Sequence, residues 1–132
     1  MKCIISAVYY IHDQGVIHRD LKTANILLSD PDDLSSIKII DFGFGERNTT
    51  KASYDEHVGT LIYMAPEVAF QHEYTKSVDV WAIGIIMHIV MTGGSHPFFD
   101  KNDSCTSFKI KLAALKSVEP DPSFHWVAKN LF

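Results

Sequence analysis

A carboxylate, an ammonium group and an amide lie within one short stretch of this sequence. The stretch HRDLKTANIL begins at His18 and contains Asp20, Lys22 and Asn25 ahead of an apolar run. A carboxylate on a loop can accept the proton of a hydroxyl group, and Lys22 would leave an extended loop on the same side as Asp20. This spacing favours proton transfer beside a fixed positive charge, although Asp20 and Asn25 taken singly would more often only cap turns.

The segments around this stretch predict the elements that would position it. Apolar residues at helical spacing predict a helix over residues 4–13, and Gly15 is a typical helix stop. The apolar runs VIHRDL and NILLS flank the polar loop, and SSIKIIDFG is rich in β-branched residues, which is typical of a strand. The sequence DPDD at residues 30–33 predicts a turn between the extended segments.

The second half of the chain predicts a loop followed by helices. Residues 43–62 are polar and lack apolar periodicity, so we expect a long surface loop. Residues 77–92 are apolar on nearly every face, which predicts a helix in the middle of a core, closed by a Gly-Gly pair. A further helix is expected near residues 108–116, and DPSFHWVAKNLF starts another. The expected fold class is mainly α with a small β-hairpin region.

The composition is that of one soluble globular domain. The chain has 132 residues, of which 46% are hydrophobic and 21% are charged, and this size allows a real core. A net charge of -4 gives no basic surface for nucleic acid or an anionic membrane. The longest apolar run, residues 80–91, is shorter than the roughly 20 residues of a membrane span. We therefore predict neither a nucleic-acid partner nor a membrane partner.

The cysteines and the first residues indicate the compartment. Cys3 and Cys105 are far apart and lack the spacing of metal ligands, which is typical of reduced thiols in a cytosolic protein. The opening MKCIISAVYYIHDQG lacks a small-x-small cleavage site and has apolar residues at helical spacing, so a buried helix is favoured over a signal peptide. We expect a cytoplasmic protein.

Four motifs follow one another along the chain: HRDLKTAN, DFG at residues 41–43, GTLIYMAPE at residues 59–67 and DVWAIG at residues 79–84. This order is similar to that in protein kinases. Over nearly its whole length the chain resembles the larger, C-terminal lobe of a eukaryotic protein kinase. Lys22 and Thr60 resemble the serine/threonine type, in which the matching residues contact the catalytic aspartate. The stretches IKIIDFG and GSHPFF are most similar to the calcium/calmodulin-dependent group.

The resemblance implies that residues 1–132 are a partial kinase catalytic domain. It implies a catalytic loop at residues 18–28, an activation segment at residues 41–67 that begins with DFG, and a central helix at residues 77–92. The activity that it implies is transfer of the γ-phosphate of ATP, with Mg²⁺, to a serine or threonine hydroxyl of a protein substrate.

Four residues would carry this chemistry. Asp20 would accept the proton of the substrate hydroxyl, and Lys22 would contact the γ-phosphate. Asn25 offers a neutral oxygen and Asp41 a charged one, which are the hard ligands that Mg²⁺ prefers. In the family these two residues hold the metal ions that bridge the nucleotide phosphates.

The resemblance also implies structural roles. His18 would pack beneath Phe42, and Asp79 would hold the backbone of the catalytic loop from below. From its place in the first turn of a helix, Asp79 could instead only complement the helix dipole. Glu67 would pair with an arginine on a late helix, but both arginines of the chain lie upstream of it. We therefore expect Glu67 to be a buried carboxylate without its partner.

Arg19 stands next to the expected base and suggests control by phosphorylation. A half-buried arginine favours an anion, and a phosphate on the activation segment would supply one. We expect an upstream activating kinase to phosphorylate one of three hydroxyls, which would then pair with Arg19 with help from Arg47; they are Thr49, Thr50 and Ser53. The alternative is that these three are ordinary loop hydroxyls.

The 132 residues lack the parts of a kinase that cover the nucleotide. They contain no glycine-rich loop followed by a strand lysine and a helix glutamate. We therefore expect a lobe that is truncated at both ends, exposes apolar surface there, and has no appreciable activity by itself.

Two other classes explain part of the pattern. A non-catalytic kinase lobe that docks substrates or regulates a full kinase would keep the motifs, but a scaffold does not need Asp20, Asn25 and Asp41 together. A metal-dependent phosphohydrolase using these three residues and a histidine would leave GTLIYMAPE and DVWAIG unexplained. We favour the kinase.

Overall fold

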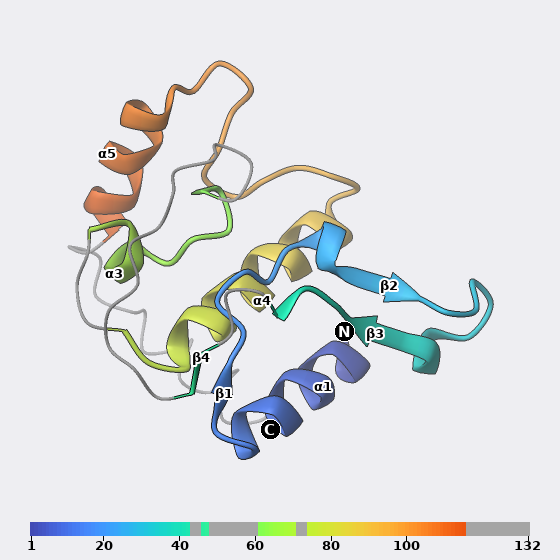
Figure 1. Ribbon diagram of the computed structural model, residues 1–132. Coiled ribbons are helices and arrows are strands. Elements are labelled where there is room, and N and C mark those ends of the chain that lie inside the picture. The colour runs from blue at the N-terminus through green and yellow to red at the C-terminus, as the bar shows by residue number, and fades with distance from the viewer. Residues whose placement is uncertain (43–45, 48–60, 71–73, 116–132) are drawn as a thin grey trace, which may run out of the picture.

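The computed structural model describes residues 1–42, 46–47, 61–70 and 74–115, which form a helix-rich fold with small antiparallel sheets (Figure 1). This confirms the predicted fold class of mainly α with a small β-hairpin region. Among the described helices, none combines the length and hydrophobicity that crossing a bilayer requires. The elements in chain order are α1 (Lys2–Asp13), β1 (Val16–Ile17), η1 (Thr23–Asn25), β2 (Ile26–Leu28), η2 (Leu34–Ser36), β3 (Ile37–Ile39), β4 (Glu46–Arg47), α3 (Pro66–Ala69), α4 (Ser77–Met91) and α5 (Cys105–Leu115).

Helix α1 forms because its apolar side chains recur on one face. Ile4 and Val8, four residues apart, are 6% and 2% exposed, whereas Tyr9 on another face is 72% exposed. The helix ends at Asp13, and Gly15 follows with φ at 74°, a conformation that glycine adopts without strain. The predicted helix and its stop are confirmed, with a start two residues earlier.

Strands β2 and β3 form the predicted hairpin. They pair antiparallel with Ile26 opposite Ile39 and Leu28 opposite Ile37. The connection holds the predicted turn at residues 30–33, where the Asp33 carboxylate accepts a hydrogen bond from the backbone of Ser35 at the start of η2. This hairpin places the residue that follows β3 beside the start of β2, because the backbone N–H of Ile40 donates to the carbonyl of Asn25.

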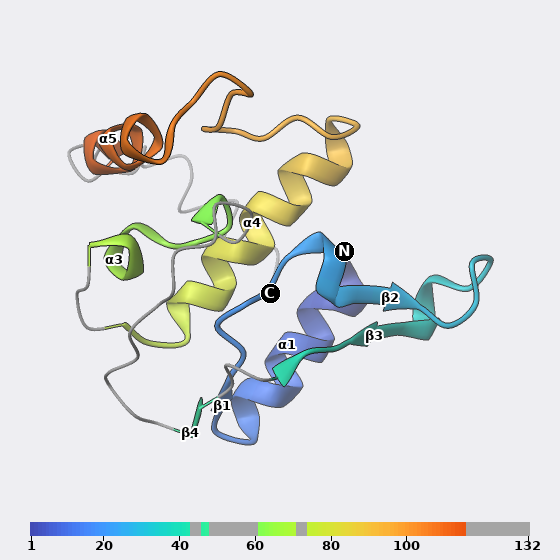
Figure 2. The same ribbon diagram turned by 45° about the horizontal axis from the view of Figure 1, so that its top comes forward.

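Helix α4 runs through the middle of the described fold. Figures 1 and 2 both show α1 on one side of it and α3 with α5 on the other. Its side chains join two apolar clusters. The first is formed by Val8, Leu21, Ala82 and Ile86. The second, against which Trp81 packs, is formed by Leu61, Phe108 and Leu112.

The predicted burial of the central helix is wrong on one face. Helix α4 ends at Met91, one residue before the predicted end, and Val80, Val90 and Met91 are 54%, 62% and 76% exposed. Among the described residues, the covered positions of the helix include Ala82 and Ile86 in the first cluster, and also Val78 and Ile85. A sequence that is apolar all round therefore does not by itself tell which faces of a helix are covered.

The predicted surface loop at residues 43–62 is also wrong in part. Strand β4 lies within this range and pairs with β1, with Val16 opposite Arg47. At the other end of the range Leu61 is 3% exposed and belongs to the second cluster. Helix α5 begins three residues before the predicted start, and the helix expected from DPSFHWVAKNLF lies outside the described residues.

Candidate active site

The backbone before Asp20 is held by a buried carboxylate from α4. Asp79 is 1% exposed, and its two oxygens accept hydrogen bonds from the backbone N–H groups of His18 and Arg19, each at 2.9 Å. Arg19 has φ at 71°, a left-handed conformation that costs a non-glycine residue on the order of 1 kcal/mol. These two hydrogen bonds offset that cost and fix the direction in which the loop enters the site.

His12 is a third donor to the same carboxylate. Its Nε2 lies 2.7 Å from Asp79 Oδ2, and Lys76 donates to the backbone carbonyl of His12. The sequence reasoning missed His12, because its partner lies 67 residues later and no local pattern joins the two. Asp79 therefore ties the end of α1 and the loop that carries Asp20 to α4, beyond any effect on the helix dipole.

Asp20 lies at the centre of a network of neighbouring side chains. It is 4% exposed, and its Oδ2 accepts from Lys22 Nζ at 2.7 Å and from Asn25 Nδ2 at 3.3 Å. Asn25 Nδ2 also donates to the Asp20 backbone carbonyl at 2.8 Å. The other carboxylate oxygen, Oδ1, is buried and has no hydrogen-bond partner among the described residues. A buried carboxylate oxygen without a donor is costly, so Oδ1 is an acceptor that a further donor group would satisfy.

Asp41 lies next to this network. It follows the residue whose N–H donates to the Asn25 carbonyl, it is exposed, and its φ is 64°. The structure therefore joins Asp20, Lys22 and Asn25 by direct contacts and places Asp41 one residue beyond a contact with Asn25. Because the carboxylate of Asp41 and the amide of Asn25 offer hard oxygen ligands, this donor set fits Mg²⁺.

A magnesium ion at such a site would take its other ligands from elsewhere. Within the part of the chain that the structure describes, no group of three or more histidine, cysteine, aspartate or glutamate side chains is gathered around one point. Mg²⁺ commonly keeps several waters and is bound through one or two protein oxygens plus substrate phosphates. The residues present therefore fit a metal ion that arrives with a nucleotide.

His18 supports the loop from inside. It is 0% exposed, its Nε2 lies 3.1 Å from the Ile40 carbonyl, and its Nδ1 accepts from the backbone N–H of Asp20 at 3.3 Å. Its ring centroid lies 4.8 Å from that of Phe42. The packing against Phe42 that the resemblance implied is present, and His18 also joins the backbone of Asp20 to that of Ile40, the residue before Asp41.

The side chain of Arg19 contacts Tyr74, which the sequence reasoning did not single out. The guanidinium donates to the Tyr74 hydroxyl and lies 5.9 Å from the centroid of the ring. The hydroxyls expected to be phosphorylated, Thr49, Thr50 and Ser53, lie outside the described residues, as do Thr60 and the side chain of Arg47. The expected pairing of Arg19 with a phosphate stays a prediction.

Glu67 differs from its expected state. It is half-buried, and its Oε1 accepts a hydrogen bond from Ser77 Oγ at 3.1 Å. The expected burial of Glu67 is therefore wrong, because the short helix α3 leaves this side chain partly accessible to water and close to the start of α4. The expected lack of an arginine partner stays a prediction. The contact joins the end of the GTLIYMAPE motif to the helix that carries Asp79.

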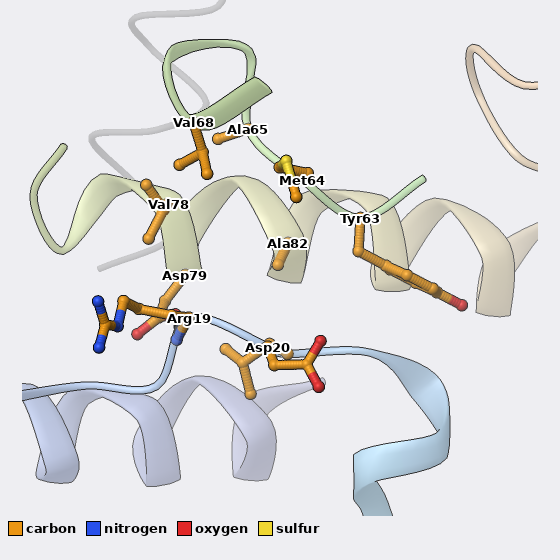
Figure 3. Close-up of a pocket in the computed structure, with 10 residues that line it drawn as sticks. Arg19, Asp20, Tyr63, Met64, Ala65, Val68, Val78, Asp79 and Ala82 are labelled. Carbon is orange, nitrogen blue, oxygen red and sulfur yellow. Dashed lines mark hydrogen bonds between the residues drawn. The ribbon is translucent and has the colours of Figure 1, made fainter. Parts of the chain in front are cut away.

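A small pocket lies between the loop that carries Asp20, residues 63–65 and α4. Figure 3 shows Arg19 and Asp79 at one end, whereas the Asp20 carboxylate extends away from them toward the side on which the Tyr63 ring lies. Tyr63, like Tyr74, is a site residue that the sequence reasoning missed. The pocket that Asp20 lines is also lined by Tyr63, Met64, Ala65, Val68, Val78 and Ala82.

Comparisons with known proteins agree with this arrangement. Residues 1–130 match the model of the protein kinase domain family. The chain is 46% identical over 101 residues to "Calcium/calmodulin-dependent protein kinase type 1" of Macrobrachium nipponense, which is 76% of this chain and 29% of that protein. It is 42% identical over 111 residues to "Calcium-dependent protein kinase 5" of Plasmodium berghei (strain Anka), which is 84% of this chain and 19% of the relative.

A plant relative extends the match. The chain is 40% identical over 124 residues to "Calcium/calmodulin-dependent serine/threonine-protein kinase 1" of Oryza sativa subsp. japonica, which is 94% of this chain and 19% of that protein. The chain thus spans less than a third of the length of these curated relatives. It belongs to the protein kinase domain family, which confirms the predicted resemblance at the level of a protein kinase.

Proposed function

We propose that this chain is the C-terminal lobe of a serine/threonine protein kinase, which transfers the γ-phosphate of ATP to a serine or threonine hydroxyl of a protein. The observation that carries the proposal is the Asp20 carboxylate. One of its oxygens is bound by Lys22 and Asn25, and the other is buried and has no partner among the described residues. The family match and the names of the relatives support it.

In the proposed mechanism the unpartnered Oδ1 of Asp20 accepts the proton of the substrate hydroxyl. Lys22 lies 2.7 Å from Asp20 Oδ2, and its positive charge would offset negative charge on the incoming phosphate. Phosphoryl transfer requires little covalent chemistry of the protein, and positioning supplies most of the catalysis. The contacts of Asp79 and His18 with the loop provide that positioning.

ATP and Mg²⁺ are the implied cofactors. When bound, the metal ion neutralises charge on the nucleotide phosphates. Asn25 and Asp41 would hold it, because they are the hard oxygen donors at the end of the hairpin. We propose further that phosphorylation of Thr49, Thr50 or Ser53 by an upstream kinase draws Arg19 away from Tyr74, and that Thr60 contacts Asp20.

We also propose that the nucleotide is covered by residues from outside these 132, because the printed sequence contains no glycine-rich loop followed by a strand lysine. Without that cover, the 132 residues alone would lack appreciable activity. The cytoplasm is the proposed compartment, since both cysteines are free thiols, which persist in reducing surroundings.

The test compares the full-length natural polypeptide that contains this chain with its Asp20→Asn variant. Substrates are Mg²⁺, ATP and an arrayed library of peptides, each with one serine or threonine. We expect phosphorylated serine or threonine from the unaltered protein and a kcat lowered about 10³-fold in the variant, because a positioned base contributes that order of rate. The exposed Asp32→Asn is the matched control and should keep full activity.

Two results would count against the proposal. An unaltered full-length protein without kinase activity, tested at saturating ATP, would favour the non-catalytic lobe instead. Full activity in Asp20→Asn would show that another group accepts the proton.

A further inference from the structure

A histidine outside the site joins the turn before α3 to the segment between α4 and α5. His96 Nε2 lies 2.8 Å from the carbonyl oxygen of Ile62, 34 residues earlier in the chain. Ile62 lies in a turn, residues 61–64, that is closed by a hydrogen bond from the Met64 N–H to the Leu61 carbonyl. Tyr63 and Met64 of this turn line the pocket. The position of one side of the pocket therefore depends on His96.

The other ring nitrogen of His96 holds the backbone of its own segment. Nδ1 accepts hydrogen bonds from the N–H groups of Phe98 at 3.1 Å and of Phe99 at 2.8 Å. A side-chain acceptor that binds N–H groups two and three residues later fixes a turn, as aspartate and asparagine commonly do. The imidazole thus joins two irregular segments, the turn 61–64 and residues 96–99.

These partners require one form of the ring. Because Nδ1 accepts from two N–H groups it carries no proton, and because Nε2 faces a carbonyl it carries one. His96 is therefore neutral, with its single proton on Nε2. A proton added to Nδ1 would take away the acceptor of both N–H groups and would leave a positive charge facing two donors.

The surroundings of the ring also disfavour a charge. The ring is half-buried and stands among three other aromatic rings, those of Phe98, Phe99 and Phe108. Burial is the main cause that lowers the pKa of His96. The contact with the Ile62 carbonyl raises this pKa, and repulsion from His88 of α4 lowers it further. The neutral form that the hydrogen bonds require is thus also the form that the environment favours.

No carboxylate pairs with His96 among the described residues. Two carboxylates follow the segment, and both are bound elsewhere, because Asp100 accepts from Asn102 and Asp103 accepts from Lys111. Apart from Asp79 at the start of α4, the other ionisable side chains of α4, α5, residues 61–65 and the segment between α4 and α5 are Tyr63, His88, Lys101, Cys105 and Lys109. Protonation of His96 would therefore gain no ion pair in the described part of the chain.

We propose that His96 is an acid-sensitive switch: its neutral ring holds the turn 61–64 to residues 96–99, and protonation of the ring releases both. The switch is closed above the ordinary histidine value of 6.5 and opens as the pH falls below it. The inference is independent of the proposed kinase function, because it concerns only contacts of the pocket's surroundings. It predicts that both segments loosen together in mild acid while the rest of the fold stays intact.

The experiment measures backbone hydrogen exchange at single-residue resolution in the full-length natural polypeptide that contains this chain. Exchange is compared at about pH 7.5 and about pH 5.5 and corrected for the intrinsic effect of pH on exchange. In the parent we expect protection of the Phe98, Phe99 and Met64 amides to fall about ten-fold at the lower pH, the order expected when one or two hydrogen bonds are lost. Amides in the middle of α1 and α4 should keep their protection.

Two variants separate the two contacts of the ring. His96→Asn places an amide oxygen near the position of Nδ1, so Phe98 and Phe99 should stay protected at both pH values, whereas Met64 should be less protected at both. His96→Gln reaches further and can donate to the Ile62 carbonyl, so the opposite pattern is expected. Neither side chain titrates in this range, so in both variants the difference between the two pH values should disappear.

The matched control is His88→Asn, which removes an exposed histidine from α4 and should keep the loss of protection in acid. Protection in the parent that is the same at both pH values would overturn the inference. So would an acid-induced loss of Phe98 and Phe99 protection in His96→Asn, because another group would then be titrating. Loss that extends equally through α1 and α4 would also overturn it, since acid would then unfold the whole domain. Kinase activity is not measured, so failure of the proposed function would leave this inference standing.

Discussion

Two histidines, His18 and His96, make the same kind of contact in two regions of the molecule. His18 Nδ1 accepts from the backbone N–H of the residue two positions later, and Nε2 meets a distant carbonyl, that of Ile40. His96 Nδ1 accepts from the N–H groups of Phe98 and Phe99 at 3.1 and 2.8 Å, and Nε2 lies 2.8 Å from the Ile62 carbonyl. In each region an imidazole fixes a short irregular segment to another part of the chain.

The surroundings of the two rings differ. His18 is fully buried beside Asp20 and contacts one aromatic ring, that of Phe42. His96 is half-buried and stands among the rings of Phe98, Phe99 and Phe108, at centroid distances of 5.6 to 6.3 Å within that group. Burial is the larger cause that lowers the pKa of His96, and a repulsion from His88 acts in the same direction, whereas the contact with the Ile62 carbonyl opposes both.

The comparison teaches that the number of hydrogen bonds does not decide which of the two histidines contributes more to stability. His96 satisfies three backbone groups and His18 two. Water can replace a lost hydrogen-bond partner at a half-buried site. At a fully buried site it cannot, so an unsatisfied polar group there costs its full desolvation free energy. Burial should therefore give His18 the larger energetic weight.

The largest effect is expected for His18→Leu. The variant introduces an apolar side chain of similar size and removes the partners of the buried Asp20 N–H and of the Ile40 carbonyl, which should lower the free energy of unfolding by about 3 kcal/mol. Urea unfolding measures this loss. Because His18 also positions Asp20, the kcat of the folded full-length protein should fall as well.

A smaller loss is expected for the matched variant His96→Leu. Three backbone groups lose their partner, but water reaches them, so the free energy of unfolding should fall by about 2 kcal/mol. The kcat of the folded protein should stay near that of the parent, because His96 does not contact the Asp20 loop in the described structure. If His96→Leu lowered the free energy of unfolding more than His18→Leu in the same urea assay, the number of hydrogen bonds, and not burial, would determine how much each histidine contributes to stability.

The smallest effect is expected from pH. Because the pKa of His96 is lowered in the folded protein, its contribution to stability is fully present above the ordinary value of 6.5 and is lost as pH falls below it, when the unfolded chain binds a proton more readily. The gap in unfolding free energy between the parent and His96→Leu should therefore narrow from about pH 7.5 to about pH 5.5. A gap that widened over this range would mean that the folded protein favours the charged ring.

Much of the local structure could be predicted from the sequence. Helices α1 and α4 and the hairpin of β2 and β3 form where apolar spacing and turn residues predict them, because these elements depend on neighbours a few residues apart. Strand β4 was missed, since two residues carry no periodicity. The exposed face of α4, with Val90 and Met91, was missed because its sequence is apolar on every side.

The site residues also divide into those that the sequence predicted and those that it did not. Asp20, Lys22 and Asn25 lie within six positions, so their contacts follow from local geometry. His12, Tyr63 and Tyr74 were not singled out, because their partners lie 67, 40 and 55 residues away. Contacts over such separations depend on how helices pack, and one sequence carries no direct signal of them.

The sequence by itself determined the chemical groups of this protein and the elements that carry them, since residue type, spacing along one helix or strand, and turn chemistry are local properties. Only the tertiary structure decided that Asp79 holds the loop that carries Asp20, that Asp20 keeps one buried oxygen without a partner among the described residues, and that Tyr63 lines the same pocket as Asp20. The physical reason is that burial and long-range hydrogen bonds arise when α1, the loop and the segment 61–65 pack together against α4.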